Sequence, residues 1–348
     1  MHLLAAALIG AYAFANGSVV ALVPQNGGLR YVDYSSGALR QLTTAPGRVL
    51  DGGPGVSVPK PVTVRLRVDN GGLWRDGKRA KRLPIVSENV SYRSGSVRIA
   101  ARLLHPAGRG PFPAVVVVPG SVPAHRTTYD LWAYFYASRG FTVLTYDKRG
   151  VGDSAGRYVR DATTANLGNQ AADALAGVAY LRSRHDVKRI GLTGGSQAGW
   201  TIALAASRSS AVSFAAIQSG AVMPVGHQLA YSELTHGGSV APPQDRIDAA
   251  LANAPDTGFD PRPALASLRI PVLWQLGSLD KRMYTPEAVA DIDAITGHDF
   301  TVRVYDGGAH SLRLTEHGTS GEETTSPGFV AGVFGDLAAW LRSRVTAR

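Results

Sequence analysis

The sequence contains no cysteine, and this absence excludes several kinds of chemistry. A 348-residue chain without cysteine has no disulfide framework, no thiol nucleophile and no thiolate ligands for zinc or iron–sulfur clusters. Charged residues are also scarce, at 18%, whereas 45% of the residues are hydrophobic. That composition excludes wholesale disorder and is sufficient for a large buried core.

Acidic residues are scarce in only one part of the chain. The formal net charge is +10, but residues 1–112 hold 15 Lys and Arg against 5 Asp and Glu, whereas residues 113–348 hold 21 of each. The basic surplus therefore belongs to the N-terminal third. A chain that was basic throughout would indicate a nucleic acid partner. This distribution does not, and we expect none.

The densest basic run covers residues 75–82 and surrounds the turn pair Asp76-Gly77. It has two interpretations: a surface for an anionic partner such as a cell-envelope polymer or lipid headgroup, or a solvated hairpin tip. Aromatic residues interleaved for nucleic acid binding are absent apart from Trp74. The hairpin is the favoured interpretation.

Long hydrophobic runs are also missing, so we expect no membrane-spanning segment. The short apolar stretch Leu3–Ile9, followed by Ala13-Phe14-Ala15, resembles a secretory signal peptide over residues 1–15, although the positively charged n-region is absent. The alternative is an ordinary amphipathic helix or a first strand that continues into Val19–Val23. The first interpretation predicts a secreted or cell-envelope protein, and the second a cytoplasmic one.

The rest of the chain contains two regions with different sequence patterns. Residues 16–94 alternate short β-like runs with Gly-, Asn- and Pro-rich turns, which predicts a small β-rich region. In residues 95–348 strands alternate with helices, which predicts an α/β fold with a doubly wound, mostly parallel sheet. A Pro- and Gly-rich insertion interrupts this pattern at about residues 221–263. We expect strands at 114–118, 141–147, 189–193, 214–219, 270–276 and 300–305, and helices at 129–138, 165–184, 197–207, 286–295 and 329–344.

The clearest chemical signal follows the strand at 189–193. The sequence Gly194-Gly195-Ser196-Gln197-Ala198 is close to the nucleophile elbow G-x-S-x-G, with alanine in place of the second glycine. The elbow needs small neighbours because its serine occupies a strained turn between a strand and a helix. The sequence therefore predicts Ser196 as a nucleophile, the alternative being a surface serine in a glycine-rich turn.

A serine hydroxyl needs a base, and the base needs an orienting acid. Hydrolases with this elbow place them in the order serine, acid, histidine. Asp280 follows the strand at 270–276, and His310 follows the last strand. His317 competes for the base role and Asp306 for the acid role, but neither position suits the role as well. We therefore expect a triad of Ser196, Asp280 and His310.

The oxyanion hole is predicted from the same loops. One backbone N–H should come from the residue after the nucleophile, Gln197, and a second from the loop after the first central strand. In that loop Pro119 cannot donate, so Ser121 is the expected second donor, with Val122 as the alternative.

A second glycine motif is a decoy. Gly150-Val151-Gly152-Asp153-Ser154-Ala155 fits a dinucleotide fingerprint, but the acid expected about 20 residues later falls on Asp173, inside a predicted helix. We assign this loop a structural role, with Asp147 and Arg149 as a partly buried pair. Neither metal-ligand spacing nor a phosphate loop is present, so no cofactor and no metal are expected.

These motifs together resemble the α/β-hydrolase superfamily, and within it the bacterial branch that is similar to dienelactone hydrolases and to cocaine esterases and related peptidases. The resemblance covers about residues 95–345 and rests on segments 119–121, 146–154, 195–200, 277–282 and 308–310. It departs from the family pattern at Pro119 and Ala198. It implies an acyl hydrolase in which residues 221–263 form a lid.

The sequence therefore predicts a serine hydrolase of the carboxylesterase type that acts on a small-molecule ester or acyl substrate through an acyl-enzyme. A peptidase or amidase of the same fold is the nearest alternative, and a catalytically silent binding module is the other. The apolar residues Met223, Leu229 and Leu234 of the predicted lid have two interpretations: a hydrophobic acyl pocket, or packing of the lid itself.

Overall fold

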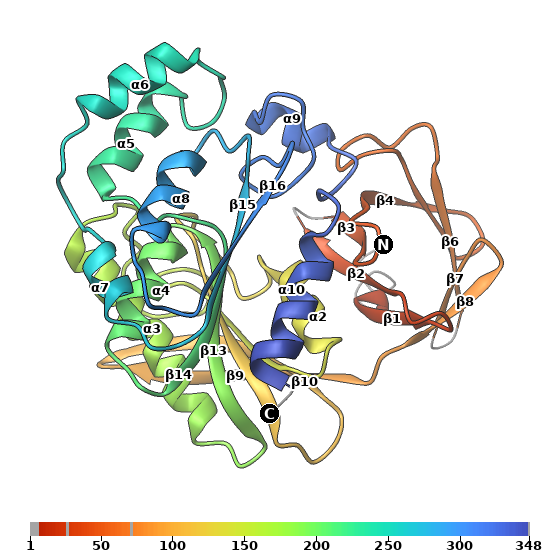
Figure 1. Ribbon diagram of the computed structural model, residues 1–348. Coiled ribbons are helices and arrows are strands. Elements are labelled where there is room, and N and C mark those ends of the chain that lie inside the picture. The colour runs from red at the N-terminus through yellow and green to blue at the C-terminus, as the bar shows by residue number, and fades with distance from the viewer. Residues whose placement is uncertain (1–6, 26–27, 70–71, 347–348) are drawn as a thin grey trace.

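The larger part of the fold is an eight-stranded sheet with helices on both faces (Figure 1). The computed structural model describes residues 7–25, 28–69 and 72–346. The strand order is β16-β15-β14-β13-β11-β12-β10-β9. Its strands are β9 (Ile85–Ser94), β10 (Val97–Pro106), β11 (Phe112–Val118), β12 (Thr142–Tyr146), β13 (Val187–Ser196), β14 (Val212–Gly220), β15 (Val272–Gly277) and β16 (Phe300–Tyr305).

The strands from β11 to β16 pair in parallel, whereas β10 is antiparallel to both of its neighbours. Residues 114–118 of β11 are all buried, as expected of a strand covered on both faces. The helices are α2 (Asp130–Ala137), α3 (Thr164–Arg182), α4 (Ala198–Ser207), α5 (Val225–Leu234), α6 (Gln244–Ala252), α7 (Arg262–Ala266), α8 (Thr285–Asp293), α9 (Ser320–Thr325) and α10 (Val333–Leu341). The predicted fold class is thus confirmed.

Each face of the sheet has its own hydrophobic core. Helices α3, α4 and α8 pack on one face, and α2 and α10 pack on the other (Figure 1). None of the helices in the described part of the chain is both long and apolar enough to cross a bilayer.

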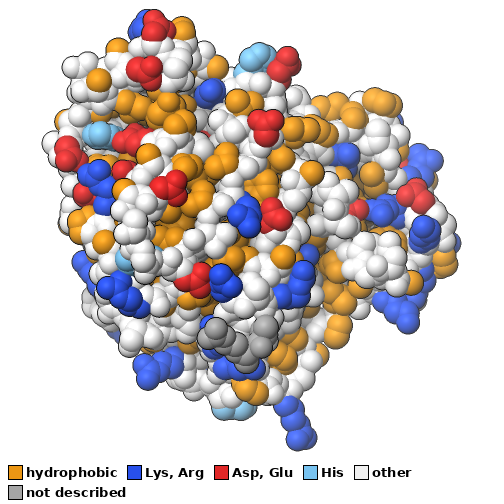
Figure 2. All heavy atoms as spheres, viewed as in Figure 1, with side chains coloured by type: hydrophobic (Ala, Val, Ile, Leu, Met, Phe, Trp, Pro, Cys, Tyr) orange, Lys and Arg blue, Asp and Glu red, His pale blue; other side chains and the backbone are white. Residues whose placement is uncertain are grey.

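The N-terminal region is a closed antiparallel barrel of eight strands, completed by the pairing of β1 with β8. The strands are β1 (Gly10–Phe14), β2 (Val19–Gln25), β3 (Gly28–Asp33), β4 (Leu39–Ala45), β5 (Val49–Gly52), β6 (Val64–Asp69), β7 (Gly72–Arg75) and β8 (Lys78–Arg82). Asp76 and Gly77 turn β7 into β8 with φ values of +51° and +73°, so the favoured hairpin interpretation is confirmed. Lys and Arg side chains gather over this end of the barrel (Figure 2).

The barrel packs on the face of the sheet that α2 and α10 cover. Tyr34, just after β3, donates its hydroxyl to the carbonyl of Leu131 at 2.7 Å. Its ring lies edge-on to Phe135 and to Phe334, with centroids 5.4 and 5.1 Å apart. This shared aromatic cluster fixes the barrel against the helices, and so determines which barrel strand lies near the loops of the sheet.

Two features near the N-terminus differ from the sequence-based organisation. The large sheet begins with β9 at Ile85 rather than at residue 95, because β9 pairs along its whole length with β10. Residues 10–14 of the predicted leader form β1, in which Tyr12 and Phe14 are buried. Residues 1–6 of that leader lie outside the described residues, and its cleavage stays a prediction.

Candidate active site

Ser196 ends β13 in a strained backbone conformation. Its φ is +59°, in the left-handed region that costs a non-glycine residue about 1–3 kcal/mol. A Cβ at Gly194 would lie 2.4 Å from the carbonyl oxygen of Val118 and 2.8 Å from the Cβ of Ala198. Gly194 therefore leaves the space that the methyl group of Ala198 occupies, which explains why the elbow accepts alanine in place of its second glycine.

Asp280 and His310 meet beyond the ends of β15 and β16. His310 Nδ1 lies 2.8 Å from Asp280 Oδ2. The other carboxylate oxygen of Asp280 accepts the backbone N–H groups of Arg282 and Met283, at 2.7 and 2.9 Å. Because Asp280 accepts hydrogen bonds at both of its oxygens, its carboxylate is fixed, and it holds the imidazole with Nε2 free of this contact.

Ser196 and His310 line the same pocket. Within the described residues the Ser196 hydroxyl makes no hydrogen bond, so it is free to turn toward His310 Nε2. That contact is often long in hydrolases without bound substrate. The structure thus brings the three predicted triad residues to one site, with the acid–base pair already joined.

The two competing residues have other partners. Asp306 accepts a hydrogen bond from the Ser278 hydroxyl at 3.3 Å. His317 is exposed and pairs with Glu322 at 2.7 Å, a contact that raises the pKa of His317. Glu316, His317 and Glu322 bring three metal-ligating atoms within 4.8 Å of one another, but none of them lines the pocket.

The predicted oxyanion donors are unoccupied by other groups of the protein. The backbone N–H groups of Ser121 and Gln197 donate to no other described residue. The N–H of Gly120 donates to the Tyr129 hydroxyl at 2.9 Å, so a donor in this loop has to lie downstream of it. A Cβ at Gly120 would lie 3.6 Å from the Ser196 Cβ, which places the loop beside the nucleophile.

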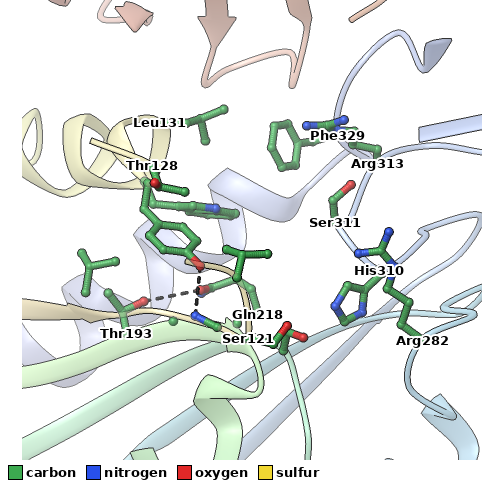
Figure 3. Close-up of a pocket in the computed structure, with 18 of the residues that line it drawn as sticks. Ser121, Thr128, Leu131, Thr193, Gln218, Arg282, His310, Ser311, Arg313 and Phe329 are labelled. Carbon is green, nitrogen blue, oxygen red and sulfur yellow. Dashed lines mark hydrogen bonds between the residues drawn. The ribbon is translucent and has the colours of Figure 1, made fainter. Parts of the chain in front are cut away.

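The pocket around Ser196 has a volume of about 310 Å³. Its walls come from β2, the end of β11 and the loop after it, the start of α2, the elbow, the end of β14, and the segments after β15 and β16 (Figure 3). Among its lining residues, all of them in the described part of the chain, there is no Asp or Glu. The lining includes the apolar residues Val122, Leu131, Trp132 and Phe329 and the basic residues Arg282, His310 and Arg313.

The insertion does not supply the apolar wall that the sequence suggested. Met223 is buried in the core of the sheet, where its carbonyl accepts the Trp200 Nε1–H at 2.8 Å. Leu229 is 55% exposed, and neither they nor Leu234 line the pocket. Of the two interpretations of these residues, the acyl pocket is wrong.

The barrel contributes to the pocket instead. Val23 and Pro24, both on β2, are part of its lining. The sequence gives almost no sign of this contribution, because nearly 100 residues separate Val23 and Pro24 from the first loop of the catalytic domain, and the chain carries no short motif for a barrel that packs on α2. A proline just before a predicted hairpin turn was the only local signal.

The decoy loop is structural, but its predicted ion pair is wrong. Arg149 pairs with Asp173 on α3, with contacts of 3.1 and 2.6 Å. Asp147 accepts the backbone N–H groups of Arg126 and Asp153, at 2.6 and 2.9 Å. Arg149 and Asp147 therefore stabilise different parts of the fold. Arg149 binds the long helix α3, whereas Asp147 binds the loops that precede α2 and α3.

Comparisons with known proteins agree with this geometry. The model of the prolyl oligopeptidase family matches residues 127–336, more than half of the chain, and this span contains Ser196, Asp280 and His310. No curated protein sequence matches the chain significantly.

Solved structures show the same fold at low identity. DcsB, solved with a substrate analogue, is 19% identical with a TM-score of 0.54, over 75% of this chain and 99% of that protein. An esterase from Pyrococcus furiosus is 14% identical with a TM-score of 0.54, over 75% of this chain and 92% of its own. An acylaminoacyl peptidase from Pyrococcus horikoshii is 14% identical with a TM-score of 0.53, over 93% of this chain but 55% of its own. With Ser196 and His310 in one pocket, with His310 joined to Asp280, and with a family match over residues 127–336, the chain belongs to the prolyl oligopeptidase family and is a serine hydrolase with the α/β-hydrolase fold.

Proposed function

We propose that the chain is a carboxylic ester hydrolase that works through an acyl-enzyme on Ser196. The observation that carries the proposal is the hydrogen bond of 2.8 Å between His310 Nδ1 and Asp280 Oδ2, because His310 lines the same pocket as the strained Ser196. A histidine held in this way presents a basic Nε2 to the serine hydroxyl.

The proposed reaction has two halves. Ser196 Oγ attacks the ester carbonyl while His310 takes its proton, and the carbonyl oxygen becomes an oxyanion that accepts the N–H groups of Ser121 and Gln197. Each such donor is worth about 3–4 kcal/mol to the transition state. His310 then returns the proton to the leaving alcohol, and water releases the acyl group by the same sequence of proton transfers.

Two observations support an ester over a peptide. The pocket is small, at about 310 Å³, and none of the described residues that line it is a carboxylate, so nothing there pairs with a peptide's amino terminus. In addition, the P. furiosus esterase is covered over 92% of its length, whereas the P. horikoshii acylaminoacyl peptidase is covered over 55%. A peptidase or amidase of the same fold is the alternative.

The test is a chain-length series of p-nitrophenyl esters beside aminoacyl anilides, with Ser196→Ala as the control. We expect turnover of esters, and fluorophosphonate labelling of the wild type but not of the variant. If the protein hydrolysed the anilides but not the esters, it would be an amidase rather than an ester hydrolase. If a fluorophosphonate did not label the folded wild-type protein, the chain would have no active nucleophile and would be a binding module.

A further inference from the structure

Two arginines, the buried Arg30 and the half-buried Arg313, lie where the barrel meets the catalytic domain, and neither has a carboxylate within ion-pair distance in the described part of the chain. Arg313 lies three residues after His310 and lines the pocket. Its Nε is buried without a hydrogen-bond partner, and one terminal nitrogen donates to the backbone carbonyl of Glu323 at 2.9 Å. Arg30, on β3 of the barrel, is 7% exposed.

Neither guanidinium forms an ion pair with a carboxylate in the described part of the chain. The Glu323 carboxylate accepts the backbone N–H of Ser311 at 2.6 Å instead. Burial and the positive charge of Arg313 lower the pKa of Arg30 to about 10. Burial also lowers the pKa of Arg313, and the nearby Glu323 carboxylate offsets only part of this shift. Because buried charges are normally paired, a positive charge at the pocket wall without a direct ion pair favours the binding of an anion.

The same pocket wall carries His310 and Arg282, and Figure 3 shows Arg313 beside Phe329 on this wall. We propose that the ester substrate carries a carboxylate, which Arg313 binds in the pocket while Arg30 strengthens the positive field from the barrel. The proposal rests on the ester hydrolase function. A planar guanidinium matches the two oxygens of a carboxylate, and within a mostly apolar pocket the pairing is weakly screened by salt ions.

The test compares two esters of matched length, p-nitrophenyl hemiglutarate and the neutral p-nitrophenyl valerate. In the wild type we expect the higher kcat/KM for the anionic ester. Arg313→Gln should reduce the anionic-to-neutral ratio tenfold or more, and Arg30→Gln should reduce it less. Arg303→Gln is the matched control, because Arg303 is exposed on β16 and outside the pocket lining.

Inhibition of the wild-type protein tests the same inference without any substitution, in case a variant fails to fold. Free glutarate should inhibit turnover of the neutral ester competitively, and butyramide should not. A wild-type preference for the neutral ester, or an unchanged ratio in folded Arg313→Gln, would overturn the inference while leaving the hydrolase intact. Absence of any ester turnover would instead remove the proposed function.

A separate observation concerns Lys148, which follows β12 and is 4% exposed. Its ammonium donates to the carbonyl oxygen of Gly120 at 2.6 Å and to Gln197 Oε1 at 3.4 Å. One buried side chain thus joins the two segments that carry the predicted oxyanion donors.

The hydrogen bond from Lys148 to the Gly120 carbonyl directly affects one predicted oxyanion donor, the N–H of Ser121. The Gly120 carbonyl and the Ser121 N–H belong to one peptide unit, and in a trans peptide these two groups point in opposite directions. An ammonium that holds the carbonyl on one side therefore directs the N–H to the other, and its charge polarises the unit and makes the N–H a stronger donor. The Tyr158 hydroxyl hydrogen-bonds the carbonyl of the next residue, Ser121, at 2.5 Å.

We infer that Lys148 is a positioning residue that orients and polarises the oxyanion hole. Like the first inference, this one rests on the hydrolase function.

Lys148 loses its charge within a pH range in which enzyme kinetics can be measured. Burial lowers its pKa to about 8. The aromatic face beside it belongs to Tyr158, 5.4 Å away, whose pKa is raised by burial. Asp147 is its neighbour along the chain, but that carboxylate is bound to Arg126 and Asp153. Lys148 is therefore a group at the oxyanion hole whose charge changes near pH 8.

Lys148→Met should lower kcat about tenfold and change KM less than about twofold. The affinity for a boronic acid, which resembles the tetrahedral intermediate, should fall with kcat. In the wild type kcat should decrease as the pH rises through about 8, and this decrease should vanish in Lys148→Met and in Lys148→Arg, which stays charged. The exposed Lys188 provides the control, Lys188→Met. An unchanged kcat in folded Lys148→Met, or the same alkaline decrease in all variants, would overturn the assignment.

Discussion

Tyr231, on the first helix of the insertion, donates its hydroxyl to the backbone carbonyl of Asp280 at 2.9 Å. Tyr231 is 1% exposed. The insertion therefore supports the loop that carries Asp280, the predicted triad acid, and this contact gives the insertion a role although it does not line the pocket. Desolvation and the nearby Asp280 carboxylate raise the pKa of Tyr231, so the phenol stays a donor over the whole working pH range.

Tyr231→Phe should weaken both stability and catalysis. It leaves a buried carbonyl without its partner, which costs about 1–3 kcal/mol of unfolding free energy, and it loosens the loop that holds Asp280, so we expect a decrease in kcat of a few fold. Tyr284→Phe is the matched control, because the Tyr284 ring packs on Tyr231 while its hydroxyl meets Gln244 at the surface. The prediction is tested by measuring the free energy of unfolding in denaturant and the kcat for an ester in both variants. Equal effects in the two variants would contradict the prediction.

Gly194→Ala should be strongly destabilising. The new Cβ would meet the backbone oxygen of Val118 at 2.4 Å and the Ala198 methyl at 2.8 Å, and a buried backbone atom cannot move aside as a flexible side chain can. We expect a loss of about 2–4 kcal/mol in unfolding free energy. The comparison is Gly335→Ala in α10, where a Cβ meets nothing within 4 Å and alanine should stabilise the helix by about 0.5–1 kcal/mol. Thermal unfolding that ranks the two variants in the opposite order would disprove this reading of the elbow.

The nucleophile itself should be a source of strain. Ser196→Ala and Ser196→Gly both remove the hydroxyl, so each should lower kcat on the order of 10⁴-fold or more. Only glycine also relieves the φ of +59°, so Ser196→Gly should unfold with about 1 kcal/mol more free energy than Ser196→Ala. Differential scanning calorimetry on the two inactive variants is the measurement. A less stable glycine variant would mean that the elbow stores no backbone strain.

The parts of this molecule that sequence could predict are those with local signals. Strand β11 is a continuous apolar run and β13 ends in the elbow sequence, so both the sheet and the loops that carry Ser196, Asp280 and His310 follow from short patterns. The closure of the barrel depends on the pairing of β1 with β8, residues that are far apart in sequence, and no local pattern encodes such a pairing. The same limit applies to the contribution of Val23 to the pocket and to the pairing of Arg149 with Asp173, which chain proximity misassigned to Asp147.

The proposed cleavage of a leader after Ala15 has a structural consequence. It would remove β1, which pairs with both β2 and β8 and places Tyr12 and Phe14 in the barrel core. A chain that begins at Asn16 should therefore expose two strand edges, unfold at lower temperature and, because β2 lines the pocket, turn over esters more slowly. N-terminal sequencing of protein from the natural host tests the cleavage itself. A mature chain that begins at residue 16 and matches the full chain in stability would show that β1 is dispensable.

The buried ammonium of Lys148 should make stability and activity respond to alkaline pH in opposite directions. Its pKa is about 8 in the folded protein and about 10.4 in an unfolded chain, so between these values the unfolded state binds more protons. The free energy of unfolding should therefore increase as the pH rises from 8 to 10.5, by up to about 3 kcal/mol. Over the same interval kcat should fall, because the Gly120 carbonyl loses its charged partner. Urea unfolding at pH 7, 8, 9 and 10 should show this increase in the wild type relative to Lys148→Met, which has no proton to lose at this site. If the difference in unfolding free energy between the two proteins stayed constant across these pH values, the ammonium would have to be charged throughout, and the alkaline loss of activity would then need another cause.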